Sequence, residues 1–367
     1  MTNLAPHTES ISPATVFRRR FFNHKPAVAG GLFLLLAVFL ALFGALVAPD
    51  GSRNANQQDL RLIALSPGSR ISQLIFVPND YLPTVWYKRW FLGEEDPLER
   101  IPLAAWRLEG ALLHYRIYDA SEASWLVVSL ETPRGSYRIK EQFYWLGTDV
   151  MGRDLLSRLL LGLRVSLGVG FIAVLISIGI GASLGAVAGY FKGRVDLWIS
   201  WLINVIWSIP SLLLVIAFSL ALGKGMWQVF LAVGLTMWVD VARIVRGQVL
   251  ALREQEFVTA ARAMGFSHFR IIFRHLLPNV VGPVIIMAAS NFATAILVES
   301  GLSFLGLGVQ PPTPSLGMMI KEHYPYIIMD AAYLALVPGV VILLLVLAFN
   351  LLGNGLSDTF DSKVKMS

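Results

Sequence analysis

The chain alternates between long apolar runs and polar segments. Six of the apolar runs are long enough, or nearly so, to cross a hydrocarbon core, which needs about 20 residues in a helix. We predict these spans at residues 27–48, 165–190, 197–222, 226–242, 279–300 and 331–353. The fourth run is short and ends near Asp240. The pattern therefore predicts an all-α multi-spanning membrane protein with six transmembrane helices.

The polar segments between the runs divide the chain into parts. The predicted parts are an N-terminal segment 1–26, a first transmembrane helix 27–48, a loop subdomain 49–160, a five-helix core 161–356 and a tail 357–367.

The loop subdomain shows a different periodicity from the spans. Residues 113–118 alternate between apolar and polar side chains, residues 125–128 form a short apolar run, and residues 137–139 follow a turn-like stretch at 132–136. Short alternating runs bounded by turn residues are typical of β-strands. We therefore predict a small subdomain that contains β-strands.

Composition agrees with a membrane protein. Of the 367 residues, 55% are hydrophobic and only 15% are charged, and the mean hydropathy is +0.62. Soluble domains have a more polar composition. The chain contains no cysteine, so disulfide and thiolate chemistry are excluded.

The distribution of positive charge predicts the orientation. Fourteen of the 30 Lys and Arg residues lie in the terminal segments and the short loops on one side, whereas the short loops on the other side contain only Lys224 and Lys321. Long translocated loops largely escape the positive-inside rule, so the loop subdomain is left out of this comparison. Both termini and residues 243–278 are predicted to be cytoplasmic, and residues 49–160 external. The net charge of +6 thus reflects topology and does not indicate nucleic-acid binding.

Two spans carry features that predict how their helices pack. Small residues recur every four positions in the second span, at Ser177, Gly181, Gly185 and Gly189, and this spacing lets helix backbones approach closely. Pro210 predicts a kink in the third span. The second span also contains a G-x-S-x-G match, but a nucleophile elbow follows a strand and needs a histidine and an acid nearby. The match therefore does not indicate a hydrolase.

The polar segment before the fifth span has the pattern of two helices joined at a glycine. Phe257, Ala261 and Met264 have i, i+4, i+7 spacing and are predicted to share one helical face that sinks into a cleft on another protein. Gly265 is predicted to end this helix, and Ser267 to cap the next one. The second helix is predicted to bury a stripe that consists of Phe269, Ile272, Phe273 and Leu276.

This segment resembles the EAA signature of ABC-importer permeases. Ala260–Ala261, Gly265 and Leu277–Pro278 match it in type and spacing, while Thr259 stands where the signature usually has an acidic residue. The resemblance implies that residues 243–278 are a docking segment for an ATPase. The residues that it implies for docking are Glu256, Thr259, Ala260, Ala261, Arg262, Gly265, Phe266, Ser267 and Pro278.

Two further stretches resemble the C-type permease subunits of dipeptide, oligopeptide and nickel importers. Residues 145–167 resemble the segment that introduces the second span, and residues 299–320 resemble the outer loop after the fifth span. Either Thr148 or Asp149 is predicted to cap the second span. Glu299 is predicted at a span boundary, where it reaches water or pairs at the pore mouth. The candidates for an external gate or a partner contact are Asp149, Arg153, Asp154 and Glu299.

The chain carries no recognisable energy source of its own. It lacks the G-x-x-x-x-G-K-[ST] phosphate-binding loop. Arg164, Asp240, Glu299 and Asp330 are all predicted at span edges, whereas ion-coupled carriers usually place such residues at mid-membrane. Work is therefore expected to come from outside the polypeptide.

The resemblance implies a type I ABC importer in a bacterial-type plasma membrane. Its expected partners are a B-type permease subunit, two ABC ATPase subunits, an external solute-binding protein and the surrounding lipid, with no cofactor, metal or catalytic residue in this chain. Di- or oligopeptides are the expected cargo. The alternatives are an ABC permease for nickel chelates or another peptide-like solute, and an ion-coupled carrier or channel that acts alone.

Overall fold

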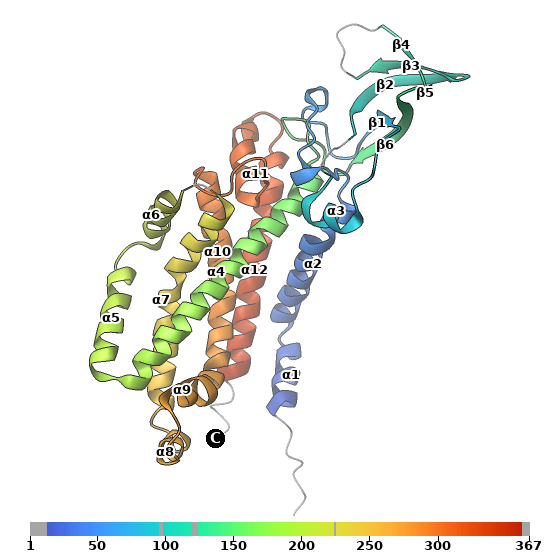
Figure 1. Ribbon diagram of the computed structural model, residues 1–367. Coiled ribbons are helices and arrows are strands. Elements are labelled where there is room, and N and C mark those ends of the chain that lie inside the picture. The colour runs from blue at the N-terminus through green and yellow to red at the C-terminus, as the bar shows by residue number, and fades with distance from the viewer. Residues whose placement is uncertain (1–12, 95–97, 119–123, 224, 362–367) are drawn as a thin grey trace, which may run out of the picture.

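The computed structural model describes residues 13–94, 98–118, 124–223 and 225–361, which form a helical bundle with one β-sheet at one end (Figure 1). The N-terminal helix α1 (Pro13–Asn23) and the short helix α8 (Glu256–Ala263) lie at the end of the bundle opposite the sheet. The C-terminal end of the last helix lies there too (Figure 1). Residues 362–367 of the predicted tail lie outside the described residues.

Five helical segments are long and apolar enough to cross a membrane, judged by length and composition. They are α2 (Lys25–Val47), α4 (Leu155–Phe191), α7 (Met226–Leu252), the run His268–Phe304 that ends in α10 (Val281–Phe304), and α12 (Tyr333–Asp361). They correspond to five of the six predicted spans.

The third predicted span is not a single straight helix. Instead α5 (Gly193–Trp207) and α6 (Ser211–Leu222) are bent by 91° at the break that contains Pro210. Proline has no N–H to continue the helix ladder and clashes with the preceding turn. The predicted kink is therefore confirmed, but the described residues hold five spans, or six only if the bent pair counts as one.

Two helix boundaries differ from the prediction. α4 begins at Leu155, ten residues before the predicted start, and α7 continues past Asp240 to Leu252, so residues 243–252 belong to a helix and not to the docking segment. Two basic side chains of this part of α7 contact α5. Arg246 Nη2 lies 2.8 Å from Asp196 Oδ2, and the Arg243 guanidinium lies 4.0 Å from the centre of the Trp207 ring.

The sheet confirms the predicted strands as β3, β4 and β6, and it adds β1, β2 and β5, which the pattern did not predict. Its order is β4-β3-β2-β1-β6-β5, with antiparallel neighbours. The strands are β1 (Ser69–Pro78), β2 (Arg100–Glu109), β3 (Leu112–Ile117), β4 (Leu126–Ser129), β5 (Glu131–Thr132) and β6 (Gly135–Tyr144). β1 pairs with β6 along its whole length, from Ser69 opposite Tyr144 to Pro78 opposite Gly135.

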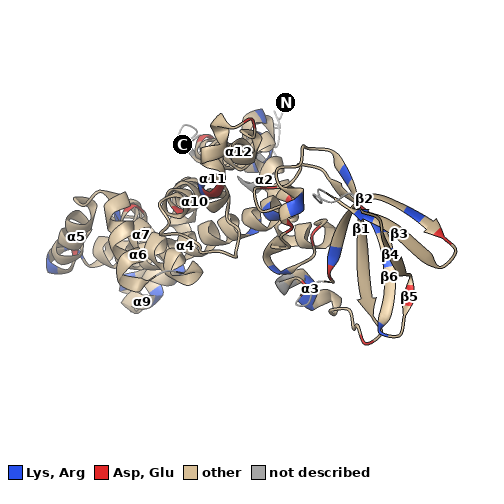
Figure 2. Cartoon of the chain, turned by 90° about the horizontal axis from the view of Figure 1, so that it is seen from above, with Lys and Arg blue, Asp and Glu red and all other residues tan. Residues whose placement is uncertain are grey.

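The sheet extends sideways from the bundle when the molecule is seen from above (Figure 2). A short helix, α3 (Trp86–Leu92), follows β1 in the chain and packs against α2. Two segments connect the sheet to the adjacent end of the bundle. They are the described loop before β1 and the segment that leads into α4.

The bundle is held by close packing between α4 and α7. A Cβ added at Gly181 would lie 2.5 Å from the Trp238 carbonyl oxygen, and one added at Gly185 would lie 2.4 Å from the Ala242 carbonyl oxygen. Such distances are far below van der Waals contact. The small residues therefore let the two backbones touch, as their spacing predicted.

Candidate coupling and gate sites

Helix α8 ends as its sequence predicts. Gly265 has φ +76°, the Phe266 N–H donates to the Ala261 carbonyl at 3.1 Å, and the Gly265 N–H donates to the Arg262 carbonyl at 2.9 Å. This pair of bonds is the Schellman motif, which satisfies carbonyls that the helix end leaves free. Nothing lies within 4 Å of a Cβ added at Gly265. The glycine is therefore needed for its backbone conformation and not for space.

Helix α8 is fixed to the bundle by one face and exposes the other. Val258 and Ala261 are buried in a cluster with Ala186, Tyr190 and Val249 of α4 and α7. The predicted apolar face is therefore only partly correct. Ala261 packs inside this chain, while Phe257 and Met264, at the edge of the same face, are exposed. The exposed pair, together with the small side chain of Ala260, forms the surface that is free to meet a partner.

The second predicted helix is irregular. Ser267 caps it, with its Oγ accepting from the Arg270 N–H at 3.3 Å, but from Ile271 to Leu276 the helix widens to π geometry before α10 begins at Val281. This widening changes the residues that face inward, so Ile271 is buried. The predicted stripe is wrong at two positions. Phe269 and Phe273 are exposed, with ring centroids 4.3 Å apart.

Most of the implied docking residues are exposed. The exposed ones are Glu256, Thr259, Ala260, Arg262, Gly265, Ser267 and Pro278. Phe266 is half-buried and Ala261 is buried. Arg262 lies 5.3 Å from the centre of the Tyr190 ring, a contact that orients its guanidinium.

At the opposite end of the bundle, a tight turn precedes α4. The Asp149 Oδ1 atom accepts from the Met151 N–H at 2.8 Å and the Arg153 N–H at 2.9 Å. Gly152 has φ +70°, and a Cβ there would lie 1.8 Å from the Asp59 carbonyl oxygen. Only glycine meets both constraints. The turn therefore brings Asp149 and Arg153 together by local geometry alone.

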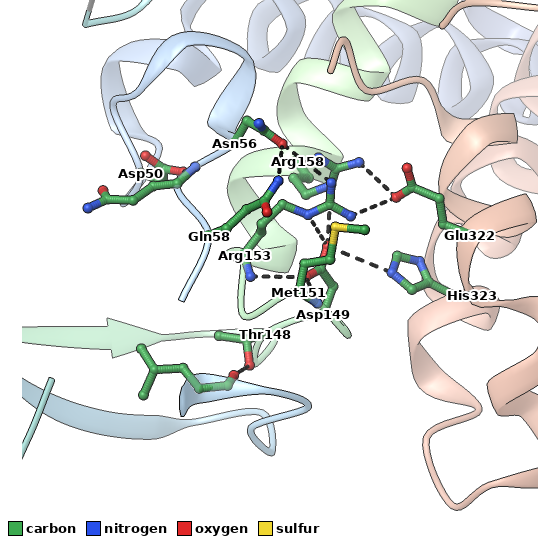
Figure 3. A network of polar contacts seen from close by, with 12 residues as sticks. Asp50, Asn56, Gln58, Thr148, Asp149, Met151, Arg153, Arg158, Glu322 and His323 are labelled. Carbon is green, nitrogen blue, oxygen red and sulfur yellow. Dashed lines mark hydrogen bonds and ion pairs between the residues drawn. The ribbon is translucent and has the colours of Figure 1, made fainter. Parts of the chain in front are cut away.

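These two residues belong to a buried ion network (Figure 3). Asp149 Oδ2 lies 2.6 Å from Arg153 Nε and 3.6 Å from Arg158 Nε. Both arginines also reach Glu322 Oε2 of α11 (Leu316–His323), at 2.7 Å from Arg153 and 3.0 Å from Arg158. His323 lies 3.8 Å from Asp149 and is fully buried. The network joins the turn, the start of α4 and α11.

The two aspartates of this turn respond differently to their surroundings. Burial alone would raise the pKa of Asp149, but His323 and the two arginines outweigh it and lower the pKa to about 2. Burial raises the pKa of Asp154 to about 6, since hydrogen bonds from Ser157 offset it only in part and the Asp50 carboxylate raises it further. One carboxylate is therefore firmly ionised, and the other titrates near neutral pH.

The cap of α4 is Asp154, and the predicted cap at Thr148 or Asp149 is wrong. Asp154 Oδ2 accepts from the Ser157 N–H at 2.8 Å. Thr148 instead fixes the preceding loop, because its hydroxyl donates to the Leu62 carbonyl and accepts from the Leu65 N–H. Asp149 is engaged by Arg153, so neither residue is available to the helix.

Glu299 is not at a water-accessible boundary, so that prediction is also wrong. It is fully buried within α10, where its carboxylate accepts from Ser166 at 3.0 Å and from Ser303 at 2.7 Å. Ser315 extends this hydroxyl cluster through Ser303 at 3.3 Å. An ionisable residue inside a spanning helix generally marks a functional position. The four predicted gate residues are thus all buried, and they contact their own chain.

A metal ion does not suit the acidic cluster. Ligand atoms of Asp149, Glu322 and His323 lie within 4.8 Å of one another. However, Arg153 and Arg158 already occupy the same carboxylate oxygens. A cation there would face two guanidinium groups, so an ion network accounts better for these residues.

Sequence reasoning missed two parts of these sites. Glu322 and His323 follow Lys321 directly, and three polar residues in a row beside an apolar helix face were the available signal. The second is a cavity of about 650 Å³ between α7, α10 and α12. Polar uncharged side chains, including Gln248, Asn279 and Asn350, line it with apolar ones.

The chain matches two family models. Residues 181–366 match the binding-protein-dependent transport system inner membrane component, and residues 12–67 match the N-terminal TM domain of oligopeptide transport permease C. The stretch between the two matches contains the whole sheet.

Two curated proteins and one solved structure are similar to the chain. The dipeptide transport system permease protein DppC of Alkalihalophilus pseudofirmus is 42% identical over 222 residues, and the glutathione transport system permease protein GsiD of Pectobacterium atrosepticum is 41% identical over 222 residues. Each alignment covers 60% of this chain and 73% of the relative. A chain of the MetNI methionine ABC transporter, in an inward-facing form, has a TM-score of 0.45 at 21% identity and covers 56% of this chain and 96% of its own.

The spans, the helix–glycine–helix segment and the family matches lead to the same assignment. The chain belongs to the binding-protein-dependent transport system inner membrane components and is a C-type permease subunit of the dipeptide and oligopeptide ABC importers.

Proposed function

We propose that the chain pairs with a B-type permease subunit to form the path of an ATP-driven importer for di- or oligopeptides. Two ABC ATPases would bind at the α8 end of the bundle, and a solute-binding protein would bind at the sheet end. Both termini and α8 would then be cytoplasmic, as the positive charge on that side favours. ATP hydrolysis would occur on the partner subunits only.

The main support for this proposal is the way α8 packs against the bundle. Its inner face, at Val258 and Ala261, shares a buried cluster with α4, α7 and the π-helical turn Ile271–Leu276, while Phe257, Ala260 and Met264 remain exposed at the end of the bundle. A partner that moves α8 would therefore move both long helices. An exposed cluster of small and apolar side chains is also typical of a protein contact.

The test alters the exposed face of α8 in the assembled transporter. Ala260→Arg places a long charged side chain on this face, and we expect it to abolish peptide-stimulated ATP hydrolysis and uptake. Gln255→Arg is the control, because Gln255 is exposed, makes no side-chain hydrogen bond to the helix end and is not among the implied docking residues, so both activities should remain. Solute-binding-protein affinity is measured in both variants and should not change, because the sheet end is unaltered.

Full uptake by Ala260→Arg would contradict docking at this face. Uphill uptake by the purified chain alone, without ATP, would instead support an ion-coupled carrier. Glu299→Gln is a second test of that alternative, because proton-coupled uptake through this buried carboxylate would be lost in the variant.

We propose that the sheet helps to seat the solute-binding protein. Ser69, the first residue of β1, lies opposite Tyr144, the last residue of β6. Because these two residues are neighbours, a short Gly-Ser linker can replace residues 70–143 with little strain. We expect weaker binding-protein affinity and lower uptake, with intact basal ATP hydrolysis in the complex. Unchanged affinity and uptake would remove this role.

A further inference from the structure

An apolar groove runs along α2 and α4, and side chains of α1, α10 and α12 complete its lining. On α2 it extends from Val28 to Leu42, a rise of about 21 Å along the helix. On α4 its wall is one helical face, which includes Leu167, Gly168 and Phe171. The groove has a volume of about 930 Å³, which lies in the range of roughly 300–1,000 Å³ typical of ligand sites.

One end of the groove carries positive charge. Arg164 is the one charged residue among the described residues that line it. Arg164 and Gly168 also line a second cavity, of about 390 Å³, to which α3 contributes Arg89 and Trp90. The apolar groove therefore meets a polar cavity at Arg164. Two guanidinium groups and one carboxylate, that of Asp50, border this cavity.

Helix α3 indicates the depth of this junction in the membrane. Trp86 and Tyr87 are exposed on it, and such aromatic residues gather at the level of the lipid headgroups. The Trp90 ring stacks on Phe43 of α2 with centroids 5.6 Å apart, and Arg164 Nη1 donates to the Trp90 carbonyl at 3.0 Å. Arg164 is thus held at headgroup level on the sheet side.

We propose that the junction binds an anionic phospholipid from the leaflet on the sheet side. Its phosphate lies between Arg89 and Arg164, and one acyl chain follows the groove along α2 and α4. Guanidinium groups recognise phosphate well, and an acyl chain needs no polar partner in the groove. A transmembrane helix of another subunit would place an apolar surface against both arginines. The proposal does not depend on which solute is transported.

The chain has no cysteine, so a single introduced cysteine can be labelled selectively. The test uses the full transporter complex in nanodiscs, with a bimane fluorophore on Gly168→Cys. Gly179→Cys is the matched control, because it lies on α4 outside the groove and a Cβ at either glycine meets no atom within 4 Å. Quenching by brominated phosphatidylglycerol is compared with quenching by brominated phosphatidylcholine at equal mole fraction.

We expect the anionic lipid to quench bimane at position 168 more strongly than the neutral lipid, and both to quench equally at position 179. Each arginine near the surface favours an anionic lipid by a factor of about five. Arg89→Gln combined with Arg164→Gln should therefore remove the preference. Equal quenching by the two lipids at position 168 would overturn the proposal. So would the absence of quenching by either lipid, which would indicate that a partner subunit covers the groove. Unchanged quenching at position 179 verifies that each variant is inserted and folded.

Discussion

The two ends of the bundle use charged residues in opposite ways. At the sheet end, Arg153, Arg158 and Glu322 are largely buried and join three chain segments. At the α8 end, Lys192 and Glu254 form a pair 2.6 Å apart, with 43% and 65% of their side chains exposed. Water can replace either partner of the exposed pair, but it cannot reach the buried arginines. An ion pair therefore fixes structure only where the solvent is excluded.

The same contrast separates a fixed end from a contact surface. At the sheet end, the ions of the network pair with one another inside the chain. The α8 end leaves Phe257, Met264 and Phe269 exposed. Exposed apolar side chains gathered in this way are typical of an interaction surface.

The largest expected effect comes from removing the shared carboxylate at the sheet end. Glu322→Leu leaves two buried arginines without this partner, and we expect destabilisation of about 3–5 kcal/mol. Glu254→Leu at the other end should leave stability unchanged. Thermal unfolding followed by tryptophan fluorescence measures both. Similar melting temperatures for the two variants would contradict the contrast between the ends.

A pH titration sharpens the same contrast through Asp154. Its pKa is raised from 3.8 to about 6 in the folded protein, so folding favours the protonated form. That contribution is complete below about pH 4 and is lost as the pH rises through about 6, a change of the order of 3 kcal/mol. Asp154→Asn keeps an acceptor for the helix cap but does not ionise.

We therefore expect the melting temperature of the wild-type protein to fall relative to Asp154→Asn between about pH 4 and about pH 8. Asp149, whose pKa is lowered to about 2, is present in both proteins, so its own contribution cancels in this difference. Parallel melting curves for the two proteins would show that Asp154 does not titrate there.

At the α8 end, a smaller effect is expected from Gly265→Ala. A left-handed backbone costs a residue with a Cβ roughly 1–2 kcal/mol, so the end of α8 should fray. Coupling between ATP hydrolysis and uptake should weaken. Gly247→Ala within α7 has open space and no positive φ, and it should be neutral or slightly stabilising. If both variants couple normally, the glycine is not needed to hold α8.

The smallest expected effect is at the cap of the second helix. Ser267→Ala removes the acceptor for the Arg270 N–H, at a cost of about 1 kcal/mol. Faster amide hydrogen exchange at residues 268–271 would report it, with Ser183→Ala on exposed α4 surface as the control. Unchanged exchange would mean that packing alone holds this turn.

Features that depend on a few neighbouring residues could be predicted from the sequence. Pro210 breaks a span, Gly265 ends a helix and Ser267 caps one, because each effect follows from the backbone chemistry of one residue. The glycine spacing of α4 was equally informative, since any helix with such a face packs closely. The apolar runs also located five of the spans, because the length and composition of a run are local features of the sequence.

Features that depend on distant segments could not be predicted. Glu322 meets Arg153 across 169 positions of sequence, and no local rule brings them together. Glu299 is at the end of an apolar run, which favoured exposure, but serines from other segments enclose it. The exposure of Phe269 and Phe273 follows from the π-helical turns, which helical periodicity does not anticipate.

The glycine contacts between α4 and α7 have a mechanical consequence. Backbones that touch leave little freedom to slide, so the two helices move as a rigid pair, and α8 is packed against both of them. α4 has 37 residues and is therefore about 55 Å long. A displacement of α8 at one surface of the membrane would thus reach Asp154 at the other without passing through a chain of intermediate side chains.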